Sequence, residues 1–127
     1  MKKIISTPKA PSAIGPYNQA TAFDKLIFTS GQIALNPATM EIVNGGVQEQ
    51  TKQVMENLKA VLEEAGSSFE NVLKTTCYLS DMDNFVAFNE IYGQYFKGET
   101  APARSTVAVK TLPKNVLVEV DTIAFKN

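Results

Sequence analysis

The sequence predicts an α+β fold in which one mixed β-sheet carries two helices packed on the same face. Two segments with helical periodicity, residues 47–65 and 83–96, each follow strand material and are each followed by a strand. The strand segments are short and rich in Val, Ile and Thr. A length of 127 residues suits a single domain, expected over residues 1–127, that buries a core without disulfide or metal support.

Short strands and turns are predicted before the first helix. The expected strands are residues 3–5, 25–30 and, past a bulge, 32–35 with a short partner at 41–43. The stretch between the first two contains Gly15-Pro16, which argues against regular structure there. Gly31 ends the strand KLIFTS, and Asn-Pro and Asn-Gly pairs supply turn signals further on.

The clearest helix is predicted over residues 47–65. Its apolar residues recur at helical spacing and leave a polar opposite side, and Gly66 follows in the place that favours glycine after a helix. The sequence SSFE at residues 67–70 is typical of a capping box opening a single turn. A second, aromatic helix begins at Asp81 or Asp83 and runs to about Phe96.

Three strands are predicted in the second half of the chain. They cover residues 72–79, 103–109 and 116–125. Side chains alternate along a strand, so Arg104, Thr106 and Lys110 share one face of their strand. The last strand is apolar on both sides, although the helices cover only one face of the sheet. The uncovered apolar face predicts self-association.

Composition excludes several classes of chemistry. The chain has one cysteine, Cys77, and no histidine, so an intramolecular disulfide, a Ser-His-Asp triad and a histidine-ligated or thiolate-cluster metal site are all excluded. We expect no cofactor. A net charge of -1 gives no basic footprint for nucleic acid. The N-terminus lacks the apolar run of a signal peptide, and no segment is long enough to span a bilayer, so we expect a cytoplasmic protein.

Arg104 and Glu119 are the main candidates for chemistry. Glu119 lies between apolar neighbours of the last strand, and a carboxylate in such a place needs a partner. One interpretation is a structural ion pair between the two residues. The other is that Arg104 is a fork for the carboxylate of a ligand, with Glu119 nearby to orient the ligand or a water.

Other polar residues have both a structural and a functional interpretation. Tyr17 lies in a turn, where tyrosines are often simply packed. Ser30 and Gly31 stand at a strand break, either an ordinary bulge or a site of free backbone N–H groups. Asn89 is either an exposed helix position or a half-buried one among aromatic neighbours. Cys77 is expected to fill the core.

Several motifs together resemble the RidA (YjgF) family. They are AIGPYNQA at residues 13–20, FTSGQIALNP at 28–37 and PARSTVAVKTLPKNVLVEVDTIA at 102–124, and the segment from residue 57 to residue 96 resembles the family as well. The resemblance covers nearly the whole chain in the same order. The Pro-Ala-Arg-Ser sequence with Glu119 downstream is its most specific part.

The resemblance implies a chorismate-mutase-like fold assembled as a homotrimer, with a central barrel and active sites in clefts between subunits. It implies a 2-iminobutanoate/2-iminopropanoate deaminase, a hydrolase that converts 2-aminoacrylate, 2-aminocrotonate and their imine tautomers to 2-oxo acids and ammonia. Pyridoxal-phosphate enzymes release these damaging intermediates of amino-acid metabolism.

Carried over residue by residue, the resemblance assigns catalysis to Arg104 and Glu119. Arg104 clamps the substrate carboxylate, helped by the backbone N–H groups of Gly31 and Thr106, and Glu119 holds or polarises the attacking water. Tyr17, Ser30 and Asn89 match further substrate-binding positions, with Tyr17 reaching the cleft from the neighbouring subunit. Many relatives have cysteine at the position of Thr106, and Cys77 lies elsewhere. The imine hydrolysis is expected to survive, since Thr106 keeps its N–H.

Two other functions are weighed against the deaminase. A non-catalytic regulatory protein could use the same Arg104 fork to sense 2-oxo acids. A ribonuclease or translation inhibitor, a label carried within the family, is disfavoured by the acidic balance, the absent histidine and the lack of an aromatic-basic surface pattern. The preferred imine side chain and the upstream enzyme do not follow from the sequence.

Overall fold

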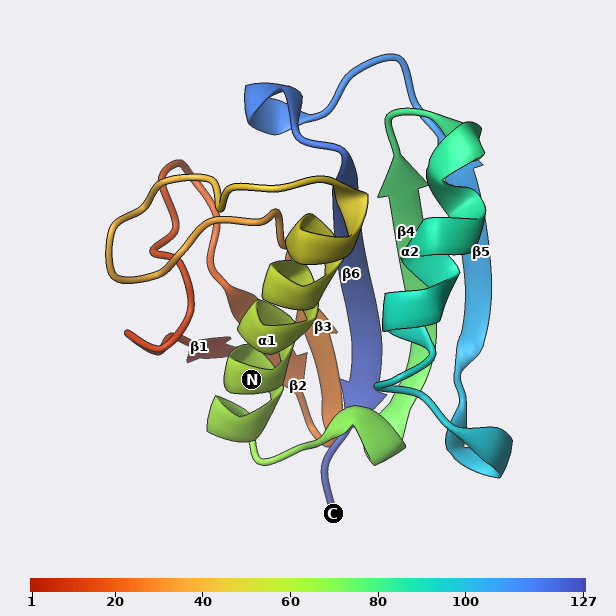
Figure 1. Cartoon of the computed structure of the whole chain (residues 1–127). Helices are drawn as coiled ribbons and strands as arrows, with labels where there is room; N and C mark the ends of the chain where they lie inside the picture. Colours follow the sequence, from red (N-terminus) through yellow and green to blue (C-terminus); the bar gives the residue numbers. More distant parts are fainter.

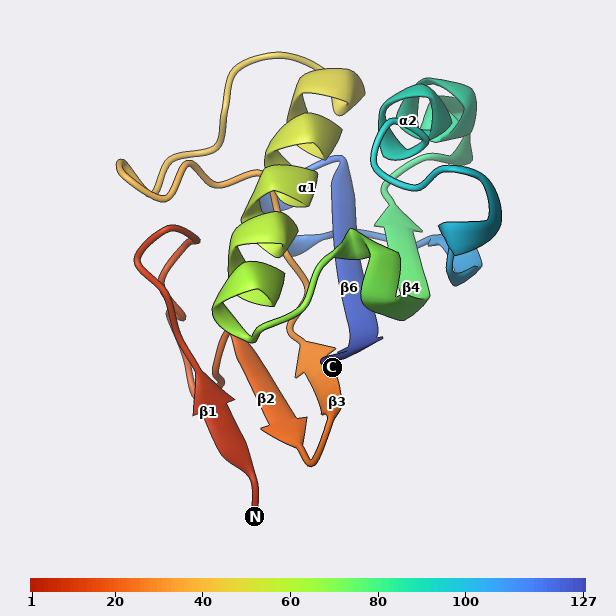
Figure 2. The same ribbon diagram turned by 90° about the horizontal axis from the view of Figure 1, so that it is seen from below.

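Six strands form one mixed sheet, and two helices lie side by side on one of its faces (Figures 1 and 2). The structure is a computed structural model that describes residues 1–127. The strands are β1 (Lys3–Ile5), β2 (Ala20–Phe23), β3 (Leu26–Thr29), β4 (Val72–Leu79), β5 (Ala103–Ala108) and β6 (Val118–Phe125). The helices are α1 (Val47–Glu64) and α2 (Phe85–Tyr92). This arrangement confirms the predicted α+β architecture.

The sheet order is β1-β2-β3-β6-β4-β5. Every pair is antiparallel except β4 and β5, which are parallel because the chain crosses over through α2 between them. The short strand β2 is not anticipated by the sequence, which assigns no strand between residues 5 and 25. A turn at Asp24, with a φ of 54°, lets β2 fold back onto β3.

The region after β3 is less regular than predicted. Residues 32–35 and 41–43 do not form strands. They make only isolated bridges, between Gln32 and Val120 and between Leu35 and Ile42. A buried amide explains why this stretch is nevertheless ordered: Asn57 Nδ2, on α1, donates hydrogen bonds of 3.2 and 2.9 Å to the carbonyls of Ile33 and Leu35.

Helix α1 ends as its sequence predicts. Gly66 adopts a φ of +82°, its N–H bonds to Glu63 O, and the N–H of Ser67 bonds to Leu62 O. These two bonds satisfy carbonyls that the last turn leaves free, and glycine adopts the required conformation without steric cost. The inward side of α1 carries fully buried residues, namely Val54, Met55, Leu58, Val61 and Leu62.

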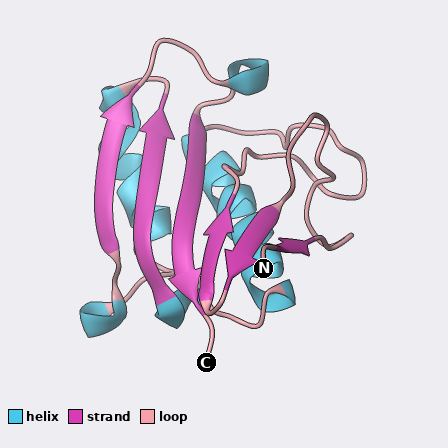
Figure 3. Ribbon diagram, turned by 180° about the vertical axis from the view of Figure 1, so that it is seen from behind, coloured by secondary structure: helices cyan, strands magenta, loops and turns pink.

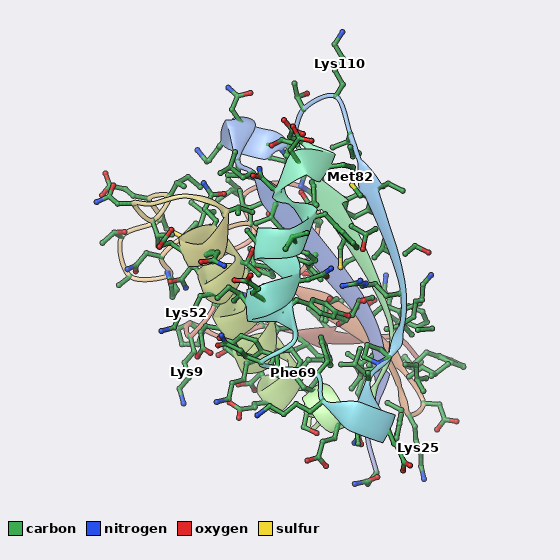
Figure 4. The ribbon with its side chains drawn as sticks, turned by 45° about the vertical axis from the view of Figure 1, so that its right-hand side comes forward. Lys9, Lys25, Lys52, Phe69, Met82 and Lys110 are labelled. Atoms are coloured by element: carbon green, nitrogen blue, oxygen red, sulfur yellow. The ribbon has the colours of Figure 1, made fainter.

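The capping box predicted at residues 67–70 is wrong. Ser68 makes no side-chain cap on the short turn Phe69–Asn71, and Ser67 Oγ instead donates to Phe125 O at 2.6 Å. Phe69 lies beyond the lower end of α2 and meets Tyr95 and Phe96 edge-on, with ring centroids 5.4 and 5.1 Å apart (Figure 4). The turn is therefore held by aromatic packing.

Helix α2 is shorter than predicted. Asp81 accepts a hydrogen bond from the N–H of Asp83 and caps the 3₁₀ turn Met82–Asn84, and α2 follows and ends at Tyr92 with Gly93 as its C-cap. The aromatic residues expected to extend it to Phe96 pack in the loop beyond. None of the helices combines the length and apolar character needed to cross a membrane.

The second face of the sheet has no cover within the chain (Figure 3). Along β6, residues alternate between fully buried positions under the helices and half-buried positions on this open face. Large apolar side chains reach the open face from β3 and β5: Leu26 is 42% exposed, Phe28 43% and Val107 45%. The strand register places Ile123 beside Phe28.

Candidate functional site

The side chain of Arg104 lies on the helix-covered side of β5, against α2. Its guanidinium carbon is 4.7 Å from the ring centroid of Tyr92 and 5.5 Å from that of Phe85. Arg104 Nη1 donates a hydrogen bond of 2.7 Å to Asn89 Oδ1. These contacts give cation–π attraction and one fixed donor, while the rest of the exposed guanidinium stays unpaired. We call Arg104, Asn89 and Thr106 the Arg104 half-site.

Thr106 follows on the same side of β5, beside Cys77 of β4. Its hydroxyl is buried without a hydrogen-bond partner. Its backbone N–H points away from β4. The N–H of Val109 bonds to Leu79 O on β4, and N–H groups alternate in direction along a strand, so the N–H of Thr106, three positions earlier, points to the opposite side. Since β5 is an edge strand, the N–H of Thr106 faces outward and remains free for a ligand.

Glu119 lies in a different place, on the floor of a cleft of about 460 Å³. The cleft is lined by Tyr17, Ser30, Gly31 and Glu119 together with Pro11, Ser12, Ile14, Gln19, Gln32, Ile33, Leu35, Pro113 and Lys114. Glu119 makes no hydrogen bond and no ion pair within the chain, although it is only half exposed. We call this group the Glu119 cleft, and it brings together four of the predicted site residues.

Of the two interpretations that the sequence left open, the structural ion pair between Arg104 and Glu119 is wrong. In the register, Arg104 is paired with Thr75 of β4, and Glu119 is paired with Tyr78. Positions 75 and 78 differ by three, an odd step along the strand, so their side chains, and those of their partners, point to opposite faces of the sheet. Arg104 faces the helices and Glu119 faces the open side. Lys110, expected on the face of Arg104, extends into solvent from the loop after β5 (Figure 4).

The Glu119 carboxyl is shifted toward its protonated form. Burial raises the pKa of Glu119, and the neighbouring Asp121 carboxylate on the same face raises it further. Asp121 itself accepts a hydrogen bond of 3.3 Å from Tyr78 Oη, and Tyr78 lies directly across from Glu119. An unpaired carboxyl with a raised pKa in a cleft is suited to accept a proton near neutral pH.

The strand break at Ser30 and Gly31 forms one wall of the cleft. Ser30 Oγ donates to Asn18 O at 2.5 Å, and the N–H of Ser30 bonds to Gln19 O. The Gly31 N–H has no partner within the chain, as the sequence interpretation allows. A Cβ at Gly31 would lie 2.8 Å from the carboxyl carbon of Glu119, closer than real Cβ contacts. Glycine is therefore required for the carboxylate to lie where it does.

Tyr17 is half exposed at the mouth of the cleft, on a loop without regular structure. Gln19, which sequence reasoning missed, holds that loop in place. Its side chain is 4% exposed, accepts from the N–H of Thr7 and donates to the carbonyls of Thr7, Ala10 and Pro11. Its sequence neighbours, Asn18 and Ala20, give no signal of burial. Gln19 thus joins the Tyr17 loop to the Ser30 wall.

Cys77 is fully buried and takes no part in either group. Burial raises the pKa of its thiol to about 11, which keeps it protonated and unreactive. The expectation that it fills the core is confirmed. No group of three or more His, Cys, Asp or Glu side chains is placed to hold a metal ion.

Comparison with known proteins adds three findings. The family model described as Endoribonuclease L-PSP matches residues 7–126. A RutC family protein of Synechocystis is 59% identical over 123 residues, which is 96% of this chain and 95% of that protein. The 2-iminobutanoate/2-iminopropanoate deaminase of Mus musculus is 48% identical, over 99% of this chain and 93% of that protein.

A solved structure agrees with the fold. The crystal structure of TdcF from E. coli, with bound serine, has a TM-score of 0.92 to this chain at 42% sequence identity. The likeness covers 98% of this chain and 99% of that one.

Proposed function

We propose a function from the premise that this chain belongs to the RidA/YjgF family, to which the L-PSP model, the mouse deaminase and TdcF connect it. We propose that it hydrolyses 2-imino acids, formed from 2-aminoacrylate and 2-aminocrotonate, to 2-oxo acids and ammonia. The observation that carries the proposal is Glu119: an unpaired carboxyl of raised pKa on the floor of a cleft.

The two halves of the site complement each other chemically. The Arg104 half-site offers a guanidinium with free donors and the outward N–H of Thr106, which suit a carboxylate. The Glu119 cleft offers a proton acceptor and the free N–H of Gly31. A small imino acid needs both: an anchor for its carboxylate and a base for the attacking water.

The halves lie on opposite faces of the sheet, so one chain does not bring them to one small substrate. We propose that the protein is a homotrimer, in which the Arg104 half-site of one subunit meets the Glu119 cleft of its neighbour. The open apolar face of the sheet, with Leu26, Phe28 and Val107, supports this assembly, because burying such a face on association is favourable.

The reaction follows from these groups. Water attacks C2 of the iminium, the π electrons of the C=N bond pass to nitrogen, and a proton of the water passes to Glu119. The carbinolamine that forms then takes that proton on nitrogen. The C–N bond breaks and ammonia leaves as the C=O bond forms, while the hydroxyl proton passes to Glu119, which releases it to the departing ammonia or to solvent. The iminium carbon is already electrophilic, so positioning of substrate and water supplies most of the acceleration.

A regulatory protein that binds 2-oxo acids without turnover is the second candidate. The serine bound to TdcF shows that a relative of this fold holds a small amino acid, which supports small-molecule binding with or without turnover. Ribonuclease activity, suggested by the name of the family model, receives no support from a chain of net charge -1 that contains no histidine.

The test is direct. A dehydratase generates 2-aminoacrylate or 2-aminocrotonate in situ, and loss of the imine signal is followed with and without the protein. We expect wild type to accelerate the loss and Arg104→Ala to lose the acceleration. Lys97→Ala removes a positive charge outside both groups and serves as control. No acceleration by a folded wild type, together with binding of 2-oxobutanoate in calorimetry, would favour the regulatory function.

A further inference from the structure

The contacts around Arg104 fix both the plane and the rotation of its guanidinium. The Tyr92 ring lies under the guanidinium, with 4.7 Å from the guanidinium carbon to the ring centroid, and sets its plane. Asn89 Oδ1 binds Nη1 at 2.7 Å and prevents the group from turning in that plane. Both residues come from α2, one helical turn apart, so a single rigid element makes both contacts.

Tyr92 is itself fixed by a contact with strand β4. Its hydroxyl shares a hydrogen bond of 2.8 Å with Thr75 Oγ1, and Thr75 is the residue of β4 paired with Arg104 in the register. Tyr92 is 7% exposed, so its ring has little freedom to move. The contacts therefore run from Arg104 to Tyr92 and from Tyr92 to Thr75, which is the strand partner of Arg104.

We propose that Asn89 and Tyr92 are positioning residues that present the Nε–Nη2 edge of Arg104 to the substrate carboxylate. The argument is geometric. A guanidinium binds a carboxylate in its plane, through two donors side by side. Asn89 occupies Nη1 and the Tyr92 ring covers one face, which leaves the Nε–Nη2 edge complete. This proposal rests on the proposed function for the identity of the ligand, and it changes the role of Asn89, predicted from sequence to bind substrate directly.

The chain allows a clean spectroscopic test, because Arg104 is its only arginine. The single arginine Nε–H signal in a ¹⁵N spectrum therefore belongs to Arg104. We expect it to be sharp and slow to exchange in the full-length wild type, and the Cδ protons of Arg104 to be shifted upfield by the Tyr92 ring. Asn89→Ala should broaden the signal. Tyr92→Leu should reduce the upfield shift to the part that the Phe85 ring contributes from 5.5 Å, and Tyr92→Phe, which keeps the ring, should retain the full shift.

Binding of 2-oxobutanoate gives the second readout. Loss of a hydrogen bond to a charged group should weaken binding by roughly tenfold or more in Asn89→Ala. Asn89→Asp should bind more weakly than Asn89→Ala, because the new carboxylate competes with the ligand for Arg104. In an Arg104→Lys background, Asn89→Ala should have little further effect, since the fork that Asn89 orients is already gone.

These experiments distinguish a failure of the positioning role from a failure of the proposed imine hydrolysis. An Arg104 signal that is the same in wild type and Asn89→Ala overturns the positioning role, whether or not imines are hydrolysed. Equal 2-oxobutanoate affinity of these two proteins overturns it as well. The predicted changes in signal and affinity, in a protein without imine hydrolysis, support the positioning role and reject the deaminase.

Discussion

The Glu119 carboxyl lies so close to Gly31 that a side chain at position 31 would displace it. We expect Gly31→Ala to lower kcat/KM for imine hydrolysis roughly a hundredfold, the cost of a misplaced catalytic group. The clash should also destabilise the fold, and this loss should shrink in a Glu119→Ala background, where the space is empty. Gly46→Ala is the control: its Cβ meets nothing closer than 3.8 Å, so the loss from replacing the N-cap glycine of α1 should be the same in both backgrounds. Equal destabilisation in both backgrounds would place the strain elsewhere.

Glu119→Gln should keep the shape of the cleft and remove its base. We expect a loss of kcat of about a hundredfold to ten-thousandfold, the usual contribution of general base catalysis. Binding of 2-oxobutanoate should change little, because the Arg104 half-site is intact. A kcat within a few-fold of wild type, measured in the coupled dehydratase assay, would assign the base to a backbone carbonyl or to water alone.

The raised pKa of Glu119 predicts how activity depends on pH. The base must be deprotonated, so activity should fall as pH drops through the Glu119 pKa, above the ordinary glutamate value of about 4.3. Asp121→Asn removes one cause of the shift and should move this acid limb to lower pH. Asp24→Asn makes the same charge change in the β2–β3 turn and should leave the limb in place. The measurement is kcat/KM against pH for the three proteins.

The same shift makes a prediction for stability. Because burial raises the Glu119 pKa in the folded state, the folded protein binds its proton more tightly than the unfolded chain does. Stability from this group is therefore present below the unfolded pKa and is lost as pH rises through the folded pKa. We expect Glu119→Gln to raise Tm above that window and to have little effect at pH 4 or below, as followed by thermal denaturation. A Tm gain that persists at low pH would point to a packing effect instead.

Gln19 should matter for stability more than a loop residue usually does. Gln19→Met keeps the volume and leaves a buried N–H and three carbonyls without their partner, so we expect a loss of about 2–3 kcal/mol in the free energy of unfolding. Gln94→Met, at an exposed position without side-chain hydrogen bonds, should change it little. Chemical denaturation at neutral pH measures both. An equal effect of the two substitutions would show that the amide network is not needed.

The proposed trimer predicts complementation between inactive variants. Arg104→Ala damages one half-site and Glu119→Gln the other, so mixed trimers of the two contain some sites with both halves intact. We expect activity to return when the two inactive proteins are unfolded together and refolded, and not when each is refolded alone. Mixtures that refold as trimers yet stay inactive would place both halves in one subunit.

Local signals predicted the long elements well. Helix α1 and strand β4 lie within a residue of their expected bounds, because periodicity and a glycine at the helix end are properties of adjacent residues. Strand β2 was missed, since four residues gain strand structure only from pairing with β1 and β3, which a local pattern does not encode.

The relation of Arg104 to Glu119 shows the same limit. Alternation along each strand gave the correct faces within that strand. Alternation does not predict the register between strands, and a register shift of one residue moves the side chains of a strand to the opposite face of the sheet. The structural ion pair was therefore wrong, while the catalytic roles of the two residues stay predictions. Gln19 and Asn57 escaped notice because a buried amide has no sequence signature apart from its surroundings.

Strand β5 is exposed to unwanted strand pairing for the same reason that its Thr106 amide is free. The edge that leaves the Thr106 N–H unpaired also presents the other outward amides of the strand, and an open edge is a template for adding another strand. Pro102 just before the strand and the charge of Arg104 within it are the kinds of residues that blunt such edges. The charge proposed to hold a substrate is thus also expected to disfavour edge-to-edge aggregation of the free chain.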